Sequence, residues 1–245
     1  MKKKFIHILL MIIFLIFISS CNNNKNDKND KTTENNYKYV TEKEMSASLL
    51  IEVTLKSNNG ASVKNYGSGV IFDEDENNYY CLTNNHVISL KPAYSSATYS
   101  IYDYNKNQFE GSLLYYDENY DLAILSFDKN NIDLNPIEFE TNDLKTNDEL
   151  FSISSLSSNM NIEEKGTFIE MTNFKYDTDD SKIDFDVISH TAKIESGSSG
   201  GMLLNNNKKL VGINFAKETI NNKEIYYAIP VLKINEFINL YEKRA

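Results

Sequence analysis

The chain has 245 residues, a hydrophobic content of 41% and a formal net charge of −10 at pH 7. This acidity argues against nucleic-acid binding and against electrostatic docking on membranes, because both surfaces are negatively charged. The length allows one two-barrel unit or two small domains, and the apolar content is sufficient for a hydrophobic core.

The beginning of the chain has the pattern of a targeting segment. Three lysines precede an apolar run that ends at Ile18, and two serines and Cys21 follow. The apolar run is shorter than the roughly 20 residues of a membrane span, so it indicates a secretory signal. The segment from Ile18 to Cys21 resembles a bacterial lipobox. We therefore predict a lipoprotein signal peptide over residues 1–20 and lipidation of Cys21.

Residues 22–36 contain asparagine, lysine, aspartate, threonine and glutamate but no apolar residue. Such a segment cannot bury enough surface to offset the entropy of ordering it. We expect residues 21–36 to form a disordered tether between the lipidated cysteine and a folded domain over residues 37–245. The predicted location is the extracytoplasmic face of the cell membrane, through the lipid anchor.

Beyond the tether, short apolar runs alternate with polar turns, which is typical of an all-β fold. Residues 130–148 are mostly polar and are expected to connect two sets of strands. Pro230 begins a short helix, in which Ile234, Phe237 and Tyr241 share one face. The predicted strands lie at 49–55, 70–72, 79–83, 99–104, 109–115, 122–127, 150–153, 167–174, 183–188, 202–204, 209–215 and 225–229.

The stretch from 195 to 203 reads Glu-Ser-Gly-Ser-Ser-Gly-Gly-Met-Leu and has the pattern of a nucleophile loop around Ser199. Gly197 can adopt backbone angles that a side chain would forbid, so its N–H can point to the same spot as that of Ser199. Two converging N–H groups stabilise an oxyanion. The alternative is a Ser/Gly surface linker, and the other motifs of the chain argue against it.

A serine hydroxyl needs a base to become a nucleophile, and the chain has three histidines. His7 lies in the predicted leader. His86 ends an apolar strand and is the better candidate, whereas His190 is interpreted as structural or as the rim of a pocket. Asp121 opens another buried strand, and the order His86, Asp121, Ser199 is a known order of catalytic triads. Taken singly, His86 would be a structural histidine and Asp121 a turn carboxylate.

Six motifs follow one another along the chain: Gly-Ser-Gly-Val-Ile-Phe at 67–72, Thr-Asn-Asn-His-Val at 83–87, Asp-Leu-Ala-Ile-Leu at 121–125, Gly-Ser-Ser-Gly-Gly at 197–201, Val-Gly-Ile-Asn at 211–214 and Ala-Ile-Pro at 228–230. Together they resemble the landmarks of HtrA-type serine proteases, which belong to the trypsin-like superfamily. The resemblance covers the chain from about Ser46 to Phe237.

The resemblance implies a chymotrypsin-like double β-barrel with a short C-terminal helix. The first barrel would span about 46–130, the second about 148–230 and the helix about 231–241. It also implies a serine endopeptidase, in which Ser199 attacks a peptide carbonyl, His86 moves the proton and Asp121 orients His86. The backbone N–H groups of Gly197 and Ser199 would form the oxyanion hole. Neither a cofactor nor a metal is expected.

By the same resemblance, Ile194 lines the first substrate pocket and favours small or medium aliphatic residues before the cleaved bond. The facing wall would consist of Asn214, Phe215 and Ala216. Lys193 would favour acidic residues if it entered the pocket, but we expect it to face solvent.

The partners expected from the resemblance are protein or peptide substrates. HtrA-type proteins usually carry PDZ domains, but this sequence ends at Ala245, soon after the predicted helix, so none is expected. The tether lacks the aromatic residues of a trimer contact, which predicts a monomer. Two other functions stay open: a non-catalytic surface lipoprotein that binds through a protease fold, and a quality-control factor with chaperone character.

Overall fold

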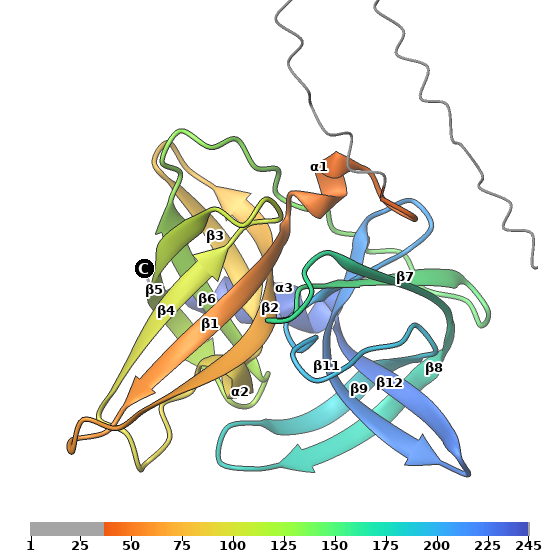
Figure 1. The fold of residues 1–245 in the computed structure, drawn as a ribbon. Helices are drawn as coiled ribbons and strands as arrows, with labels where there is room; N and C mark the ends of the chain where they lie inside the picture. The colour runs from red at the N-terminus through yellow and green to blue at the C-terminus, as the bar shows by residue number, and fades with distance from the viewer. Residues whose placement is uncertain (1–36, 245) are drawn as a thin grey trace, which may run out of the picture. The chain divides into compact units, whose positions relative to one another are not determined.

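The computed structural model describes residues 37–244, and within them two closed barrels of six strands each are followed by a helix (Figure 1). The predicted signal peptide, the tether and Cys21 lie outside the described residues. The elements in chain order are α1 (Glu42–Met45), β1 (Ser48–Lys56), β2 (Ser62–Glu74), β3 (Asn78–Thr83), α2 (Asn85–Ile88), β4 (Ser96–Tyr102), β5 (Gln108–Asp117), β6 (Leu122–Asp128), β7 (Glu149–Ser154), β8 (Ile162–Asp177), β9 (Lys182–His190), β10 (Met202–Leu204), β11 (Leu210–Ile220), β12 (Lys223–Pro230) and α3 (Val231–Glu242).

The two barrels have the same strand order. The first runs β1-β2-β3-β6-β5-β4 and the second runs β7-β8-β9-β12-β11-β10, with antiparallel neighbours throughout. Each barrel therefore closes a sheet of six strands on itself, which leaves no open edge along its wall. This architecture confirms the prediction of an all-β, chymotrypsin-like double β-barrel with a short C-terminal helix.

Strand β1 shows why the sequence forms these barrels. Leu49, Ile51, Val53 and Leu55 are almost fully buried, whereas the side chain of Glu52 between them is more exposed. Successive side chains of a strand point to opposite faces, so this alternation places one face in the barrel interior. The same strand pairs with β2 on one side and with β4 on the other.

Two strands begin five or more residues earlier than the apolar pattern predicts. Strand β2 begins at Ser62 and not at residue 70, and β8 begins at Ile162 and not at residue 167. The added residues are mainly polar and partly exposed. Their backbones pair with β1 and β7, so main-chain hydrogen bonding extends these strands where side-chain burial gives no signal. The one-turn helices α1 and α2 are too short to produce a helical period.

The connector between the barrels pairs with both of them. The N–H of Ile137 donates to the carbonyl of Ile71 in the first barrel at 2.9 Å. At the next residue, the carbonyl of Glu138 accepts the N–H of Leu210 in the second barrel at 2.8 Å. These bonds fix the connector at the junction of the two barrels.

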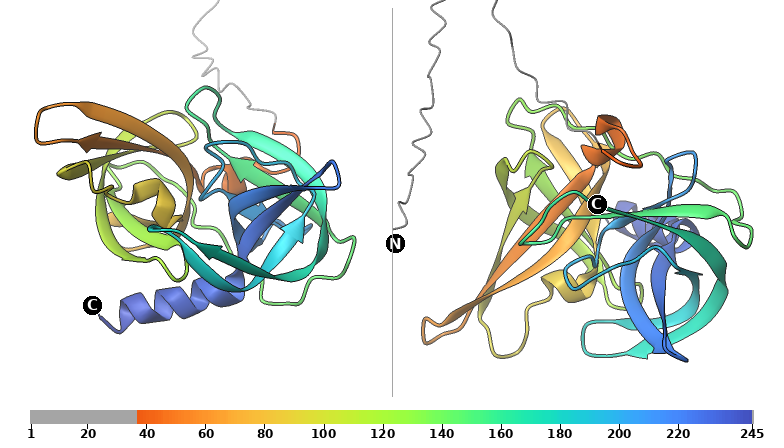
Figure 2. Two further views of the ribbon diagram at one scale, coloured as in Figure 1. Left: turned by 90° about the horizontal axis from the view of Figure 1, so that it is seen from below. Right: turned by 45° about the vertical axis from the view of Figure 1, so that its right-hand side comes forward.

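Helix α3 begins after Pro230 and packs from the second barrel against the first (Figure 2). Ile234 and Phe237 are fully buried. The ring of Phe237 stacks on Tyr115 of β5, with 5.2 Å between the ring centroids. No helix within residues 37–244 has both the length and the apolar character that crossing a bilayer requires.

Candidate active site

His86 and Asp121 are brought together by two paired strands of the first barrel. Strand β3 pairs with β6, with Thr83 opposite Ala123, so the residues next to these strand ends become neighbours. The Nδ1 of His86 lies 2.7 Å from Oδ2 of Asp121. The backbone N–H of His86 donates to Oδ1 of the same carboxylate at 2.9 Å. Asp121 is completely buried, so its carboxylate is held at the Nδ1 edge of the imidazole and away from water.

The two asparagines before His86 hold the backbone of Asp121. The side-chain amide of Asn84 donates to the Asp121 carbonyl at 2.9 Å, and the backbone N–H of Asn85 donates to it at 3.1 Å. Asp121 has a φ of +50°, a left-handed conformation that is unfavourable for a residue with a side chain. Hydrogen bonds to its carbonyl and both carboxylate oxygens stabilise this conformation. The sequence motif showed the histidine but not this role of the asparagines.

The loop around Ser199 contains two glycines in the left-handed backbone conformation. Gly197 and Gly200 have φ values of +96° and +86°. The N–H of Ser198 donates to the carbonyl of Glu195 and that of Gly201 donates to Ser198. Within residues 37–244, the N–H groups of Gly197 and Ser199 donate to no acceptor, so both are free to bind an oxyanion.

Ser198, beside the candidate nucleophile, is a buried anchor for the loop. Its Oγ lies 3.1 Å from Oγ of Ser154 in β7 and accepts the N–H of Glu195 at 3.1 Å. These neutral hydrogen bonds tie the loop to the wall of the second barrel.

Ser68 of β2 connects the first barrel to the same loop. Its N–H donates to the carbonyl of Ser199 at 2.7 Å, and its hydroxyl lies 3.0 Å from the carbonyl of Gly197. The hydroxyl also accepts a hydrogen bond from the N–H of Ser155 at 3.0 Å. The carbonyl of Ser68 accepts one from the hydroxyl of Thr83 at 2.7 Å. Ser68 is fully buried, so each of these bonds is shielded from water.

His86, Gly197 and Ser199 line one cleft of about 410 Å³, together with residues of β2 that include Lys64 and Tyr66. Within the described residues, the hydroxyl of Ser199 makes a single long hydrogen bond, 3.5 Å to the carbonyl of Phe215, and none to His86. His86 and Ser199 thus line the same cleft, and Asp121 contacts His86, but no hydrogen bond joins Ser199 to His86 within the described residues.

The residues expected to form the first substrate pocket differ from one another in burial. Ile194, Asn214 and Phe215 are buried, and Ala216 is half-buried. The amide of Asn214 donates to Ser152 Oγ at 3.0 Å and to the Met202 carbonyl at 3.3 Å, inside the second barrel. Lys193 forms a surface ion pair with Glu195, which directs its charge away from the barrel.

His190 is buried next to this wall. Burial lowers the pKa of His190 to about 3, because the charged imidazolium would lose its hydration. Asn214 and the backbone of Ala192 oppose this shift only weakly, and neither forms a hydrogen bond to the ring. The ring packs beside Tyr226, with centroids 5.9 Å apart. A neutral, enclosed ring of this kind is structural.

Cys81 is the other nucleophilic side chain of interest, and it lies in the core of the first barrel. Burial raises the pKa of its thiol to about 12, so a reactive thiolate does not form there at neutral pH. Residues 37–244 hold no cluster of three or more histidine, cysteine, aspartate or glutamate side chains arranged to bind a metal ion.

The fold and this site define a trypsin-like peptidase architecture, and comparison with known families agrees. The trypsin-like peptidase domain family matches residues 67–213, and the chain belongs to this family. Curated proteins give no match.

Solved structures give a further comparison. The chain is similar to the crystal structure of the Rv3671c protease from M. tuberculosis in its active form, with a TM-score of 0.64 and 19% identity. The match covers 80% of this chain and 81% of that one. At this identity the likeness supports the fold alone.

Proposed function

We propose that the chain is a serine endopeptidase that cleaves proteins through His86, Asp121 and Ser199. The observation that carries this proposal is the double contact of the Asp121 carboxylate with the backbone and ring of His86, beside a cleft that Ser199 also lines. Such a carboxylate fixes the imidazole tautomer, with the proton on Nδ1 and the lone pair of Nε2 directed at the serine.

The proposed reaction begins with rotation of the Ser199 side chain from the Phe215 carbonyl towards His86. Rotamer changes of accessible side chains take picoseconds to nanoseconds, so this step does not limit the rate. Ser199 Oγ then attacks the peptide carbonyl while Nε2 of His86 takes its proton. The oxyanion binds the N–H groups of Gly197 and Ser199, each worth about 3 kcal/mol in the transition state. His86 next protonates the leaving amine, and water hydrolyses the acyl-enzyme.

For specificity, we propose that small or medium aliphatic residues precede the cleaved bond. Ile194 and Phe215 are apolar and buried, and Lys193 is neutralised by Glu195 at the surface. A peptide library would test this preference, and cleavage mainly after aspartate or glutamate would contradict it.

We also propose that the enzyme acts as a monomer outside the cytoplasmic membrane, anchored through a lipid on Cys21. The support is the sequence pattern before Cys21 and the apolar-free segment after it. A Cys21→Ala substitution should move the protein from the membrane fraction to the soluble fraction. Unchanged membrane association would exclude this anchor.

A fluorophosphonate probe, which bonds covalently to an activated serine, tests the proposed chemistry. Intact mass should show one adduct, and peptide mapping should place it on Ser199. Labelling should be lost in Ser199→Ala and in His86→Ala. Ser157→Ala is the matched control, because Ser157 lines the same cleft but lies outside the proposed triad, and it should label normally.

One observation favours the second candidate function, a non-catalytic surface lipoprotein that binds through the protease fold. The Ser199 hydroxyl is bonded to the Phe215 carbonyl and not to His86. If a folded protein failed to react with the probe, this binding function would replace the peptidase.

A further inference from the structure

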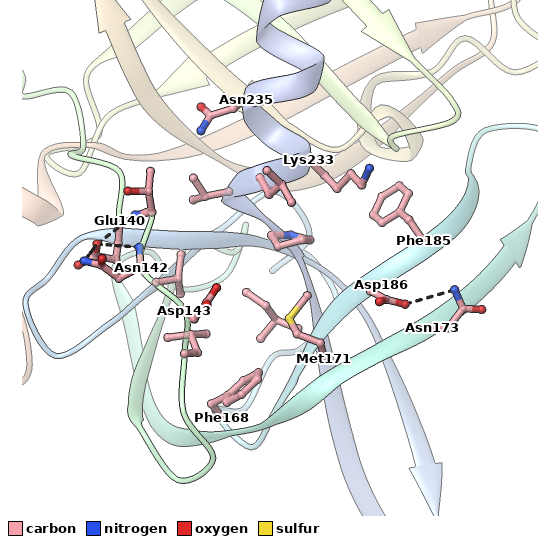
Figure 3. Close-up of a pocket in the computed structure, with 17 residues that line it drawn as sticks. Glu140, Asn142, Asp143, Phe168, Met171, Asn173, Phe185, Asp186, Lys233 and Asn235 are labelled. Carbon is pink, nitrogen blue, oxygen red and sulfur yellow. Dashed lines mark hydrogen bonds between the residues drawn. The ribbon is translucent and has the colours of Figure 1, made fainter.

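A second concavity of about 820 Å³ lies where the connector, the second barrel and the start of α3 meet. We call it the α3 groove. Residues 140–144 form one wall, β8 and β9 form the other, and residues 230–235 lie along the top (Figure 3). It shares no lining residue with the cleft of His86 and Ser199. Its volume is in the range of sites that bind ligands.

The interior of the α3 groove is apolar. Phe168, Ile188 and Val211 are buried in its floor. Met171 and Leu232 also line it, and their exposed fractions are 45% and 69%. Single exposed apolar side chains are common on protein surfaces, but two that line one concavity provide a place where a partner's apolar side chain would lose its contact with water.

Carboxylates that accept hydrogen bonds only from neutral groups, or from none, surround this apolar interior. Glu140 and Asp143 lie on the connector wall, and Asp186 lies on the opposite wall (Figure 3). Within residues 37–244 none of the three forms a salt bridge. The N–H groups of Asn142 and Thr141 lower the pKa of Glu140, which keeps that carboxylate charged.

The one lysine that lines the α3 groove does not balance this charge. The Nζ of Lys233 bonds to both carboxylate oxygens of Glu236, at 2.8 and 3.0 Å. The groove therefore combines an apolar interior with net negative walls, and its electrostatic complement is a cationic partner.

The apolar interior indicates a peptide with an apolar side chain and not a small cation. A second hollow of about 560 Å³ adjoins the groove and shares Glu140, Asn142, Asp143 and Leu144 with it. It continues past Asp148 and Glu149. Both hollows therefore border the connector, so a peptide in the α3 groove would lie beside the carboxylates of Glu140 and Asp143, with Asp186 on the opposite wall.

Two occupants from this protein itself fit poorly. Residues 22–36 contain no apolar residue to insert between Met171 and Leu232. A second copy of the chain also carries a net charge of −10, so acidic walls would face an acidic surface.

We propose that the α3 groove binds a peptide segment of a partner protein, in which one large aliphatic or aromatic side chain is flanked by lysine or arginine. The apolar side chain inserts between Met171 and Leu232. The basic residues bind Glu140 and Asp143 on one wall and Asp186 on the other. This binding requires no catalysis, so the Ser199→Ala protein binds the segment as well as the unaltered protein does.

The test is selection from a display library of random twelve-residue peptides on the full Ser199→Ala chain, with Leu232→Asp in the same background used to remove other binders. Leu232 is largely exposed, so its replacement leaves the fold intact. Enriched peptides should contain Leu, Ile, Met or Phe next to Lys or Arg. If no such peptides are enriched, or if acidic peptides dominate, the proposal is wrong.

Fluorescence anisotropy with the most enriched peptide then measures how much individual residues of the α3 groove contribute to the binding affinity. Leu232→Asp should weaken binding at least tenfold, and the pair Asp143→Asn with Asp186→Asn should weaken it several-fold and reduce its salt dependence. Ile220→Asp is the matched control, because Ile220 is also an exposed aliphatic residue but lies outside the groove, and it should bind normally. Equal affinity for wild-type and Leu232→Asp proteins would overturn the proposal.

A second copy of the chain is the other possible occupant of the groove. Self-association that rises with protein concentration and is abolished by Leu232→Asp would identify it, and this result would also overturn the proposal.

Discussion

The two barrels hold their candidate catalytic residues in different ways. In the first barrel, His86 is bound by the carboxylate of Asp121. In the second barrel, the loop that carries Ser199 is fixed by neutral hydrogen bonds and by glycines with positive φ angles. Asp121 is buried, accepts the backbone N–H of His86 and lies 2.7 Å from its Nδ1. Ser199 lies in a loop fixed by the Ser198 hydroxyl and by the positive φ angles of Gly197 and Gly200. The two barrels share a strand order, so this difference comes from the loops and not from the architecture.

The difference indicates which half is rigid before substrate binds. Hydrogen bonds to a charged group are roughly twice as strong as neutral ones, so the His86–Asp121 pair is the better fixed of the two. Within residues 37–244 the Ser199 hydroxyl makes a single bond of 3.5 Å, to the Phe215 carbonyl, and none to His86. Ser68 is where the two halves meet, because it bonds to Thr83 of the first barrel and to the carbonyls of Gly197 and Ser199.

The largest effect is expected from Asp121→Asn, which removes the charge beside His86 and leaves the loop of Ser199 unchanged. The amide would still accept the backbone N–H of His86, but its NH₂ would face Nδ1 and place the imidazole proton on Nε2. His86 could then no longer accept the proton of Ser199. We expect the rate of fluorophosphonate labelling to fall by about 10⁴-fold with the fold retained.

The matched control for this variant is Asp103→Asn. Asp103 is also fully buried in the first barrel, and among residues 37–244 its carboxylate bonds only to Asn105 and Asn107. Its replacement should lower stability but leave the labelling rate unchanged. A similar loss of rate in both variants would show that any buried carboxylate of this barrel matters equally, which contradicts a specific role for Asp121.

Ser68→Ala tests the junction of the two halves and should have a smaller effect. Loss of the hydroxyl leaves the buried N–H of Ser155 without an acceptor and frees the carbonyl of Gly197. An unsatisfied buried group costs about 1–3 kcal/mol, so we expect lower stability and a labelling rate reduced by about 10- to 100-fold.

Ser48→Ala separates the two consequences, because Ser48 is equally buried and reaches only the hydroxyl of Ser155, at 3.5 Å. It should label at the normal rate. If Ser68→Ala destabilised the protein but labelled as fast as Ser48→Ala, Ser68 would be structural and would not position the oxyanion loop.

The sequence predicted the fold class and the proposed triad because both leave local signals. Alternating apolar residues mark β1, and short motifs surround His86 and Ser199. Gly197 was identified because a loop with converging N–H groups needs a residue that tolerates positive φ, and its φ is +96°. These properties depend on residues within a few positions of one another.

The sequence could not predict the network around Ser68, because its partners are distant in the chain. Ser155 and Gly197 follow Ser68 by 87 and 129 residues. The same reason hides the contacts of Ser198 with Ser154. The α3 groove was also not predictable, since the connector, two strands and a helix contribute separate residues that only the folded chain brings together.

The last prediction concerns His190, a buried and uncharged residue of the second barrel, and the dependence of protein stability on pH. Its folded-state pKa of about 3 lies below its ordinary value of 6.5, so the unfolded chain binds more protons between these values. Stability from this group is therefore complete above pH 6.5 and is lost as the pH falls towards 3. From pH 6.5 to pH 5 we expect a loss of about 2 kcal/mol in the free energy of unfolding.

Substituting His190→Phe keeps a ring beside Tyr226 and removes the titrating group, so the loss between pH 6.5 and pH 5 should shrink by about that 2 kcal/mol. Urea unfolding at pH 7, 6 and 5 measures it. Tyr226→Phe is the control, because it loses the hydrogen bond to Glu224 but keeps His190, and it should retain the acid sensitivity. If His190→Phe lost stability with acid as steeply as the unaltered protein, the imidazole would have to become charged in the folded second barrel. The second barrel would then contain a buried charge, as the first does at Asp121. This would contradict the difference between the two barrels.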